Sequence, residues 1–162
     1  MIVTKRFALV RATSLACSSA AHRPTLRMLR DHCATIVARS GMAYSIVRLD
    51  LEVEGICPAT HENAVLRVID ELFSNALEHG FYGRQRGRVF VHVVTREAVG
   101  VAVSVSDDGW GFADGDIVDG NGFHLLRSIG KLRLGAPAGP FPAWGAVTVE
   151  IAIPPSPEDR PR

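Results

Sequence analysis

Residues 46–54 alternate between apolar and charged side chains, which is the period-two pattern of a strand with one buried face. The apolar positions are Val47, Leu49, Leu51 and Val53, and the charged positions are Arg48, Asp50, Glu52 and Glu54. Because antiparallel sheets commonly leave one face in solvent, this pattern predicts a half-buried strand of an antiparallel sheet.

Two longer segments carry apolar residues at helical spacing, over 24–40 and 61–79. Pro24 can begin the first helix, because the N–H group that proline lacks has no partner in a first helical turn. Gly80 follows the second segment as a C-terminal cap. The apolar face of the second helix is expected to consist of Val65, Ile69, Leu72, Phe73 and Ala76.

The second half of the chain predicts a hairpin of strands at about 88–95 and 101–106, then a helix at about 122–129. Two further strands are expected at 132–134 and 147–153. The sum is an α/β (α+β) fold: a two-layer sandwich with a mixed, mainly antiparallel sheet of about five strands and helices on one face. Residues 24–153 form the expected domain, 1–23 a leader or helix remnant, and 154–162 a disordered tail.

The composition narrows the class of protein and its partners. A chain of 162 residues that is 47% hydrophobic can build one core. A net charge of +1 argues against capture of nucleic acid or a membrane surface, and no apolar run reaches the roughly 18–20 residues of a membrane span. Cys17, Cys33 and Cys57 show no zinc or disulfide spacing, which favours a reducing, cytoplasmic location.

Three polar residues follow each other at i, i+4 and i+8 on the predicted second helix: Glu71, Asn75 and His79. This spacing places them along one side of the helix, next to its apolar face. Asn75 can supply a hard oxygen ligand to Mg²⁺, and Glu71 can orient or deprotonate a hydroxyl group or water. A solvated helix face is the alternative interpretation of the same residues.

A glycine-rich stretch follows the hairpin and holds two further motifs. Asp107-Asp108-Gly109-Trp110-Gly111 comes directly after a strand, where glycines allow a ligand to approach the backbone. Gly120-Asn121-Gly122-Phe123 begins a helix, whose free N–H groups can bind phosphate. Each motif alone could be an ordinary turn, but their order on helix, strand end and helix start favours a nucleotide site.

These motifs resemble the boxes of the superfamily that joins histidine kinases, gyrase B, heat-shock chaperones and mismatch-repair ATPases. The run 70–79 (DELFSNALEH) resembles its N box, and residues 107–111 resemble its G1 box. Residues 120–123 resemble its G2 box, and residues 144–147 weakly resemble its last box. The eight-residue lid, 112–119, and the strand at 46–54 are similar to short-lid two-component sensor kinases. The resemblance implies the Bergerat-type ATP-binding fold of that superfamily.

The resemblance also implies roles, with ATP and Mg²⁺ as cofactors. Asn75 would ligate Mg²⁺, Asp107 would recognise the adenine amine, and Glu71 would be the catalytic carboxylate. The remaining residues that would bind nucleotide are His79, Gly109, Gly111, Gly120, Gly122 and Phe123.

The resemblance leaves three functions open. The first is a histidine kinase catalytic domain that passes the ATP γ-phosphoryl group to a histidine on a partner chain, such as a dimerisation domain in a response-regulator pathway; a homodimer is compatible with this. The second is an anti-sigma-factor-type serine kinase, whose partners are a sigma factor and its antagonist. The third is a degenerate, non-catalytic phosphotransfer or binding module of the same fold that binds no nucleotide. It is suggested by the acidic Glu78 where lysine is common and by the lack of an evident phosphoacceptor histidine.

Overall fold

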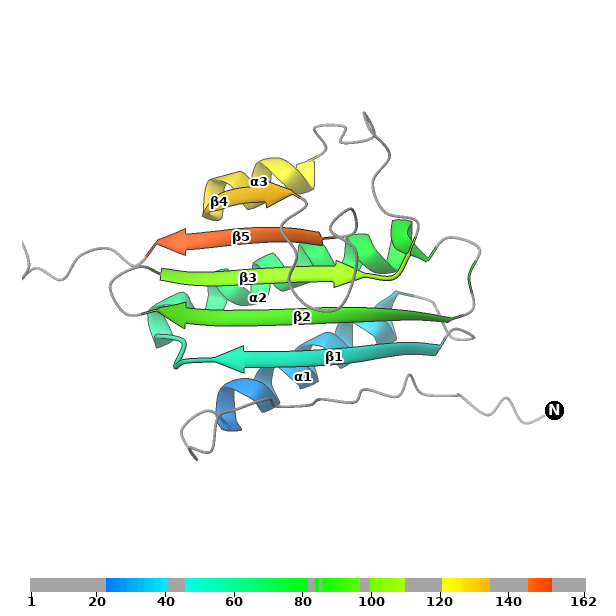
Figure 1. Ribbon diagram of the computed structural model, residues 1–162, viewed down its shortest axis with the longest axis horizontal. Helices are drawn as coiled ribbons and strands as arrows, with labels where there is room; N and C mark the ends of the chain where they lie inside the picture. Colours follow the sequence, from blue (N-terminus) through cyan, green and yellow to red (C-terminus); the bar gives the residue numbers. More distant parts are fainter. Residues whose placement is uncertain are drawn as a thin grey trace, which may run out of the picture.

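A sheet of five strands forms one layer, and helices cover one of its faces (Figure 1). The computed structural model describes residues 23–40, 46–81, 84, 86–96, 100–109, 121–134 and 146–152. In chain order the described elements are α1 (Arg23–Arg39), β1 (Ile46–Glu54), α2 (Ala59–Asn75), the π-helical turn η2 (Ala76–Gly80), β2 (Arg86–Arg96), β3 (Gly100–Asp107), α3 (Asn121–Ile129), β4 (Lys131–Leu134) and β5 (Ala146–Ala152). The predicted two-layer sandwich is confirmed. The predicted tail and residues 1–22 of the predicted leader lie outside the described residues.

The sheet has the order β1-β2-β3-β5-β4 and is mainly antiparallel, as predicted. The pairing of β1 is the exception, because β1 runs parallel to β2, with Val53 opposite Val93. The expectation of an antiparallel neighbour for residues 46–54 was therefore wrong. Alternation of apolar and polar residues shows that one face of a strand is buried. It does not show direction, because an edge strand that runs parallel or antiparallel to its neighbour has the same pattern. The long connection through α2 permits the parallel pairing.

The core lies between the sheet and the helices. The four apolar residues predicted to face inward from β1 are each at most 3% exposed. They pack with inward-facing residues of the other strands and with the apolar faces of α1 and α2. The principal contributors are Leu29, Cys33, Ile36, Val65, Ile69, Phe73, Val89, Val91, Val103 and Val105. This burial is the main stabilising term of the fold.

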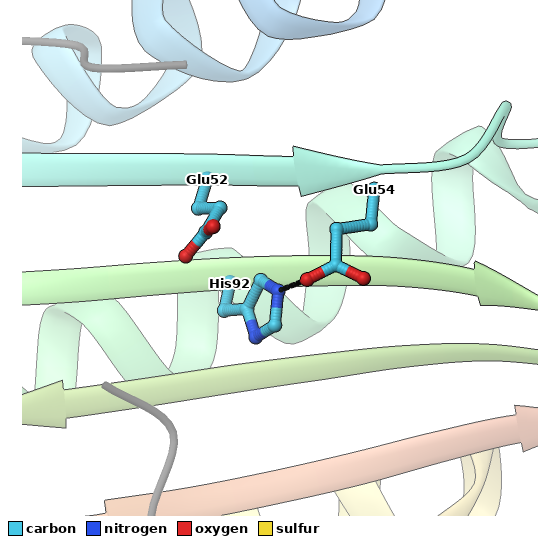
Figure 2. A group of neighbouring side chains, drawn as sticks. All are labelled: Glu52, Glu54 and His92. Carbon is cyan, nitrogen blue, oxygen red and sulfur yellow. Dashed lines mark hydrogen bonds and ion pairs between the residues drawn. The ribbon is translucent and has the colours of Figure 1, made fainter. Parts of the chain in front are cut away.

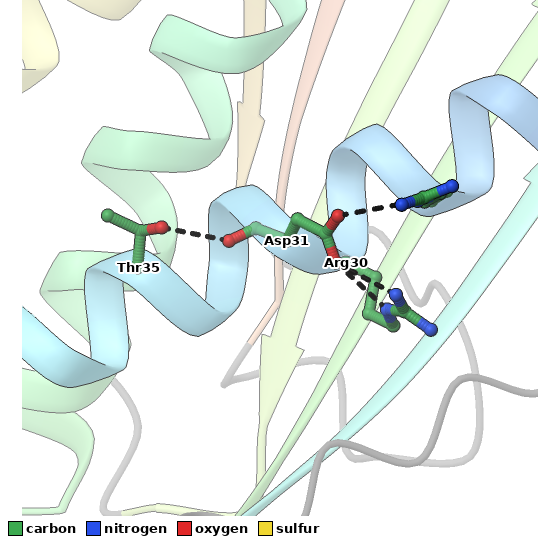
Figure 3. A network of polar contacts seen from close by, with 4 residues as sticks. Arg30, Asp31 and Thr35 are labelled. Atoms are coloured by element: carbon green, nitrogen blue, oxygen red, sulfur yellow. Dashed lines mark hydrogen bonds and ion pairs between the residues drawn. The ribbon is translucent and has the colours of Figure 1, made fainter.

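The opposite side of α1 is polar. Asp31 accepts hydrogen bonds from the guanidinium of Arg30 and lies 3.8 Å from the Arg27 Nε, while Thr35 Oγ1 donates to the Asp31 carbonyl (Figure 3). All these contacts are exposed, so they contribute little to stability. They mark the solvent face of a helix whose other face is core. None of the described helices is both long and apolar enough to cross a membrane.

The second predicted helix, 61–79, occurs as two consecutive parts. An α-helix runs to Asn75, and a π-helical turn completes the element at Gly80. The turn buries Ala76 and Leu77 and leaves Glu78 and His79 exposed. Single π-helical turns are rare and often lie at functional sites. This one packs the end of the second helix against the end of β3.

Cys33 and Cys57 are free and buried. Burial, with a smaller effect from the carboxylate of Asp70, raises the pKa of the Cys33 thiol to about 12. Burial and the nearby Glu62 also raise the pKa of Cys57. Both thiols therefore stay protonated at neutral pH and behave as core residues.

Candidate functional site

Asp107 is the last residue of β3 and lies opposite Val89 of β2. Its register places the side chain on the helix-covered side of the sheet, where the residue is 8% exposed. The Gly109 N–H donates a hydrogen bond of 2.8 Å to Asp107 Oδ1. A buried carboxylate is thus held at the end of a strand, where it can accept a hydrogen bond from an amine.

Two glycines let the π-helical turn contact the residues after β3. A Cβ atom added at Gly109 would lie 2.2 Å from the carbonyl oxygen of Gly80. A Cβ atom added at Gly80 would lie 2.8 Å from Asp107 Oδ1. The backbone of one segment therefore occupies the space that a side chain on the other would need. Gly80 was predicted to be the helix cap, but it is the last residue of the π-helical turn, whose C-cap is Phe81. Its contact with Gly109 was missed because it joins segments almost thirty residues apart.

The environment of Asp107 favours its neutral form. Burial is the largest influence and raises the pKa of the Asp107 carboxyl above its ordinary value. The hydrogen bond from Gly109 lowers the same pKa, the adjacent Asp108 raises it, and Arg84 lowers it. The net direction is upward, so an ionised Asp107 is held at a cost in folding free energy.

Asp108, the residue after the end of β3, is hydrogen-bonded to strand β2. The Arg88 N–H donates to Asp108 Oδ1 at 2.8 Å, and the Asp108 N–H donates to the Arg88 carbonyl at 3.1 Å. The Arg84 guanidinium donates to the Asp108 carbonyl and lies over the Phe81 ring. These contacts extend the pairing of β2 and β3 past its last residue pair. We call Gly80, Asp107, Asp108 and Gly109 the Asp107 half of the site.

A second group comes from α2 and the start of α3. Asn75 Nδ2 donates to Glu71 Oε1 over 3.5 Å, a long contact between two half-buried side chains. A Cβ atom added at Gly122 would lie 1.7 Å from Glu71 Oε1, so the first turn of α3 lies directly against this carboxylate. We call Glu71, Asn75 and Gly122 the Glu71 half of the site. It presents a carboxylate and an amide, whose oxygens suit Mg²⁺, beside a helix N-terminus.

The other predicted site residues have different surroundings. Phe123 is half-buried and packs against the core. His79 is exposed and belongs to the π-helical turn, so the i, i+4 spacing that links Glu71 to Asn75 does not continue to it as α-helix. Gly111, Gly120 and the predicted lid, 112–119, lie outside the described residues.

Solved structures provide the comparison with known proteins. The chain superposes on the blue-light activated histidine kinase EL346 of Erythrobacter litoralis with a TM-score of 0.61 at 21% identity, over 78% of this chain and 41% of that one. It superposes on the histidine kinase domain of the same protein with a TM-score of 0.57 at 19% identity, over 85% of this chain and 65% of that one.

The chain thus spans about two fifths and just under two thirds of the lengths of these structures. A scan against models of protein families and a search of curated protein sequences each found no match. The fold likeness agrees with the resemblance carried by the motifs. The described part of the chain therefore has the α/β sandwich fold of histidine kinase ATP-binding domains.

Proposed function

We propose that the chain is an ATP-binding catalytic domain of the two-component histidine kinase type. It would bind Mg²⁺-ATP and transfer the γ-phosphoryl group to a histidine on a partner chain, releasing ADP. The observation that supports this most strongly is the Gly80–Gly109 contact. It brings the end of the motif-bearing helix α2–η2 against the buried Asp107, in a fold shared with histidine kinase domains.

Each half of the site has a part in this proposal. Asp107 would accept a hydrogen bond from the adenine amine, and Gly109 would leave room for the base. Asn75 would hold Mg²⁺, which supplies charge neutralisation for the phosphates, and the α3 N-terminus would bind phosphate oxygens. Glu71 would accept the proton that the imidazole releases when it attacks the γ-phosphorus. Catalysis would depend mainly on positioning and electrostatics.

Phosphotransfer from labelled ATP tests the reaction. The protein is incubated with γ-labelled ATP and Mg²⁺, alone and with histidine-containing dimerisation domains or with serine-bearing anti-sigma antagonists. We expect an acid-labile label on a histidine of the partner and none on this chain. Label on a partner serine would instead support the anti-sigma-type kinase. Label on this chain that disappears in His22→Ala would contradict transfer to a partner.

A loss of function in matched variants would connect the reaction to the site. Asn75→Ala and Glu71→Gln should each reduce transfer, whereas Glu54→Gln, an exposed position on the other face of the sheet, should not. Equal transfer by all four proteins would show that the site lies elsewhere. Absence of both transfer and Mg²⁺-ATP binding in the wild type would support the degenerate module.

A further inference from the structure

Two arginines face each other on the side of the sheet that the helices leave open. Arg48 of β1 and Arg88 of β2 are direct Cα partners, and the alternation of both strands points them away from the core. Like charges in opposed positions destabilise a strand pair. Asp50 lies between them: Arg48 Nε donates to its Oδ1 at 3.1 Å, and Arg88 Nη2 donates to its Oδ2 at 3.0 Å.

Asp50 is far more buried than its partners. Its side chain is 11% exposed, against 44% for Arg48 and 43% for Arg88. A shielded carboxylate that receives two charge-assisted hydrogen bonds holds both guanidiniums in place more firmly than an exposed ion pair does. The geometry of Arg88 therefore depends on Asp50.

Arg88 connects this ion triad to the candidate site. Its side chain is held by Asp50, while its backbone exchanges two hydrogen bonds with Asp108, as described above. Asp108 is the neighbour of both Asp107 and Gly109. Arg88 links strand β1 to the candidate site, because the order of the sheet places β2 between β1 and β3.

We propose that Asp50 is a positioning residue for the Asp107 half of the site and acts through Arg88. Without its charge, the Arg48 and Arg88 guanidiniums repel each other, Arg88 shifts, and the paired Asp108 moves with it. The expected loss of nucleotide affinity without the Asp50 charge rests on the proposed function. The expected shift of the backbone at residues 108 and 109 is independent of that function.

A second carboxylate contact on the same two strands, between Glu54 and His92, provides a control. His92 Nε2 lies 2.9 Å from Glu54 Oε1, and Glu52 lies beside them on the same open face (Figure 2). Glu54 lies four residues after Asp50 on β1, and His92 lies four residues after Arg88 on β2, a distance of about 13 Å along each strand. The pair has the same diagonal arrangement across β1 and β2, but its carboxylate is more exposed and it has no connection to Asp108 among the described residues.

The experiment compares Asp50→Asn, Glu54→Gln and the double variant Asp50→Asn/Arg48→Met. Amide chemical shifts are recorded by NMR for the protein without nucleotide, and Mg²⁺-ATP affinity is measured by calorimetry. Asp50→Asn should shift the amide signals of Arg88, Asp108 and Gly109 and weaken binding by about fivefold, within the range typical of indirect positioning effects. Glu54→Gln should leave both readouts unchanged.

The double variant separates positioning from general destabilisation. Removing Arg48 removes the repulsion, so the Asp108 and Gly109 signals should return toward their wild-type positions and much of the affinity should be restored. Asp108 and Gly109 signals that stay unchanged in Asp50→Asn, or that shift equally in Glu54→Gln, would overturn the proposal. If the wild type binds no nucleotide, the proposed function fails, while the amide signals still decide the role of Asp50.

Discussion

The two halves of the candidate site are built in different ways. In the Asp107 half, backbone lies against backbone, the key carboxylate is buried, and the hydrogen bonds from backbone N–H groups measure 2.8–3.1 Å. In the Glu71 half, the half-buried side chains of Glu71 and Asn75 share one 3.5 Å contact. A Cβ atom added at Gly122 would first meet the tip of the Glu71 side chain. The first half is therefore a fixed part of the fold, whereas the second can rearrange by moving Glu71 and Asn75.

This difference matches the tasks that we propose for the two halves. A base is recognised by shape and by a few fixed hydrogen bonds, so a rigid surface favours selectivity. Phosphate groups and Mg²⁺ change position and charge during transfer, and flexible side chains can follow them. Changing one glycine or one carboxylate at a time tests whether the two halves differ in rigidity.

Gly122→Ala should have the largest effect on the reaction. The new methyl group would collide with Glu71 Oε1 and displace the carboxylate by more than an ångström, and displacements of that size can reduce rates by about a hundredfold. Stability should not fall, because alanine favours helix over glycine. Phosphotransfer rates and urea unfolding, measured together, would show this combination. Full activity in Gly122→Ala, with loss in Glu71→Gln, would contradict the close contact.

Gly109→Ala should act mainly on the folded state. Its methyl group would meet the Gly80 carbonyl oxygen at 2.2 Å, and backbone on both sides leaves little freedom to relax. We expect a loss of about 1–3 kcal/mol in the free energy of unfolding, typical of overpacking. Urea denaturation measures it directly. A stability equal to that of Gly122→Ala would show that the Asp107 half is no more rigid than the Glu71 half.

Asp107→Asn should have a smaller effect of opposite sign. The folded-state pKa of Asp107 lies above its ordinary value, so the folded protein binds this proton more tightly than the unfolded chain. The ionised carboxylate therefore costs stability, and stability is lost as pH rises through the folded-state pKa. At pH 7 the amide should therefore stabilise the protein, which thermal unfolding would show as a higher Tm than that of the wild type.

The gain from Asp107→Asn should shrink as the pH falls through the folded-state pKa of Asp107, because the wild-type carboxyl then becomes neutral. Thermal unfolding at several pH values checks this. A lower stability of Asp107→Asn than of the wild type at pH 7 would contradict this. It would mean that the ionised carboxylate stabilises the folded protein.

Sequence reasoning succeeded where the physical cause is local. The alternation of residues 46–54 predicted which four side chains are buried, because a strand places every second side chain on one face. The spacing of Val65, Ile69 and Phe73 predicted the buried face of α2 for the same kind of reason. The position of Asp107 at a strand end was also predicted.

Features that depend on distant parts of the chain were missed. The parallel pairing of β1 follows from the route of the connection through α2, and alternation carries no information on direction. The π-helical turn ends the regular spacing before His79, although the residue types there also suit an α-helix. Gly80 and Arg88 belong to the site only because tertiary packing brings them to Gly109 and Asp108.

The most direct test of the central claim is a calorimetric titration of Mg²⁺-ATP into the wild type and Asp107→Asn, with Glu54→Gln as the control. We predict one nucleotide per chain for the wild type and the control. Binding by Asp107→Asn should be at least about tenfold weaker, because a hydrogen-bond acceptor for the adenine amine is replaced by a donor. No binding heat in the wild type, or equal affinity in Asp107→Asn, would contradict the account of this site.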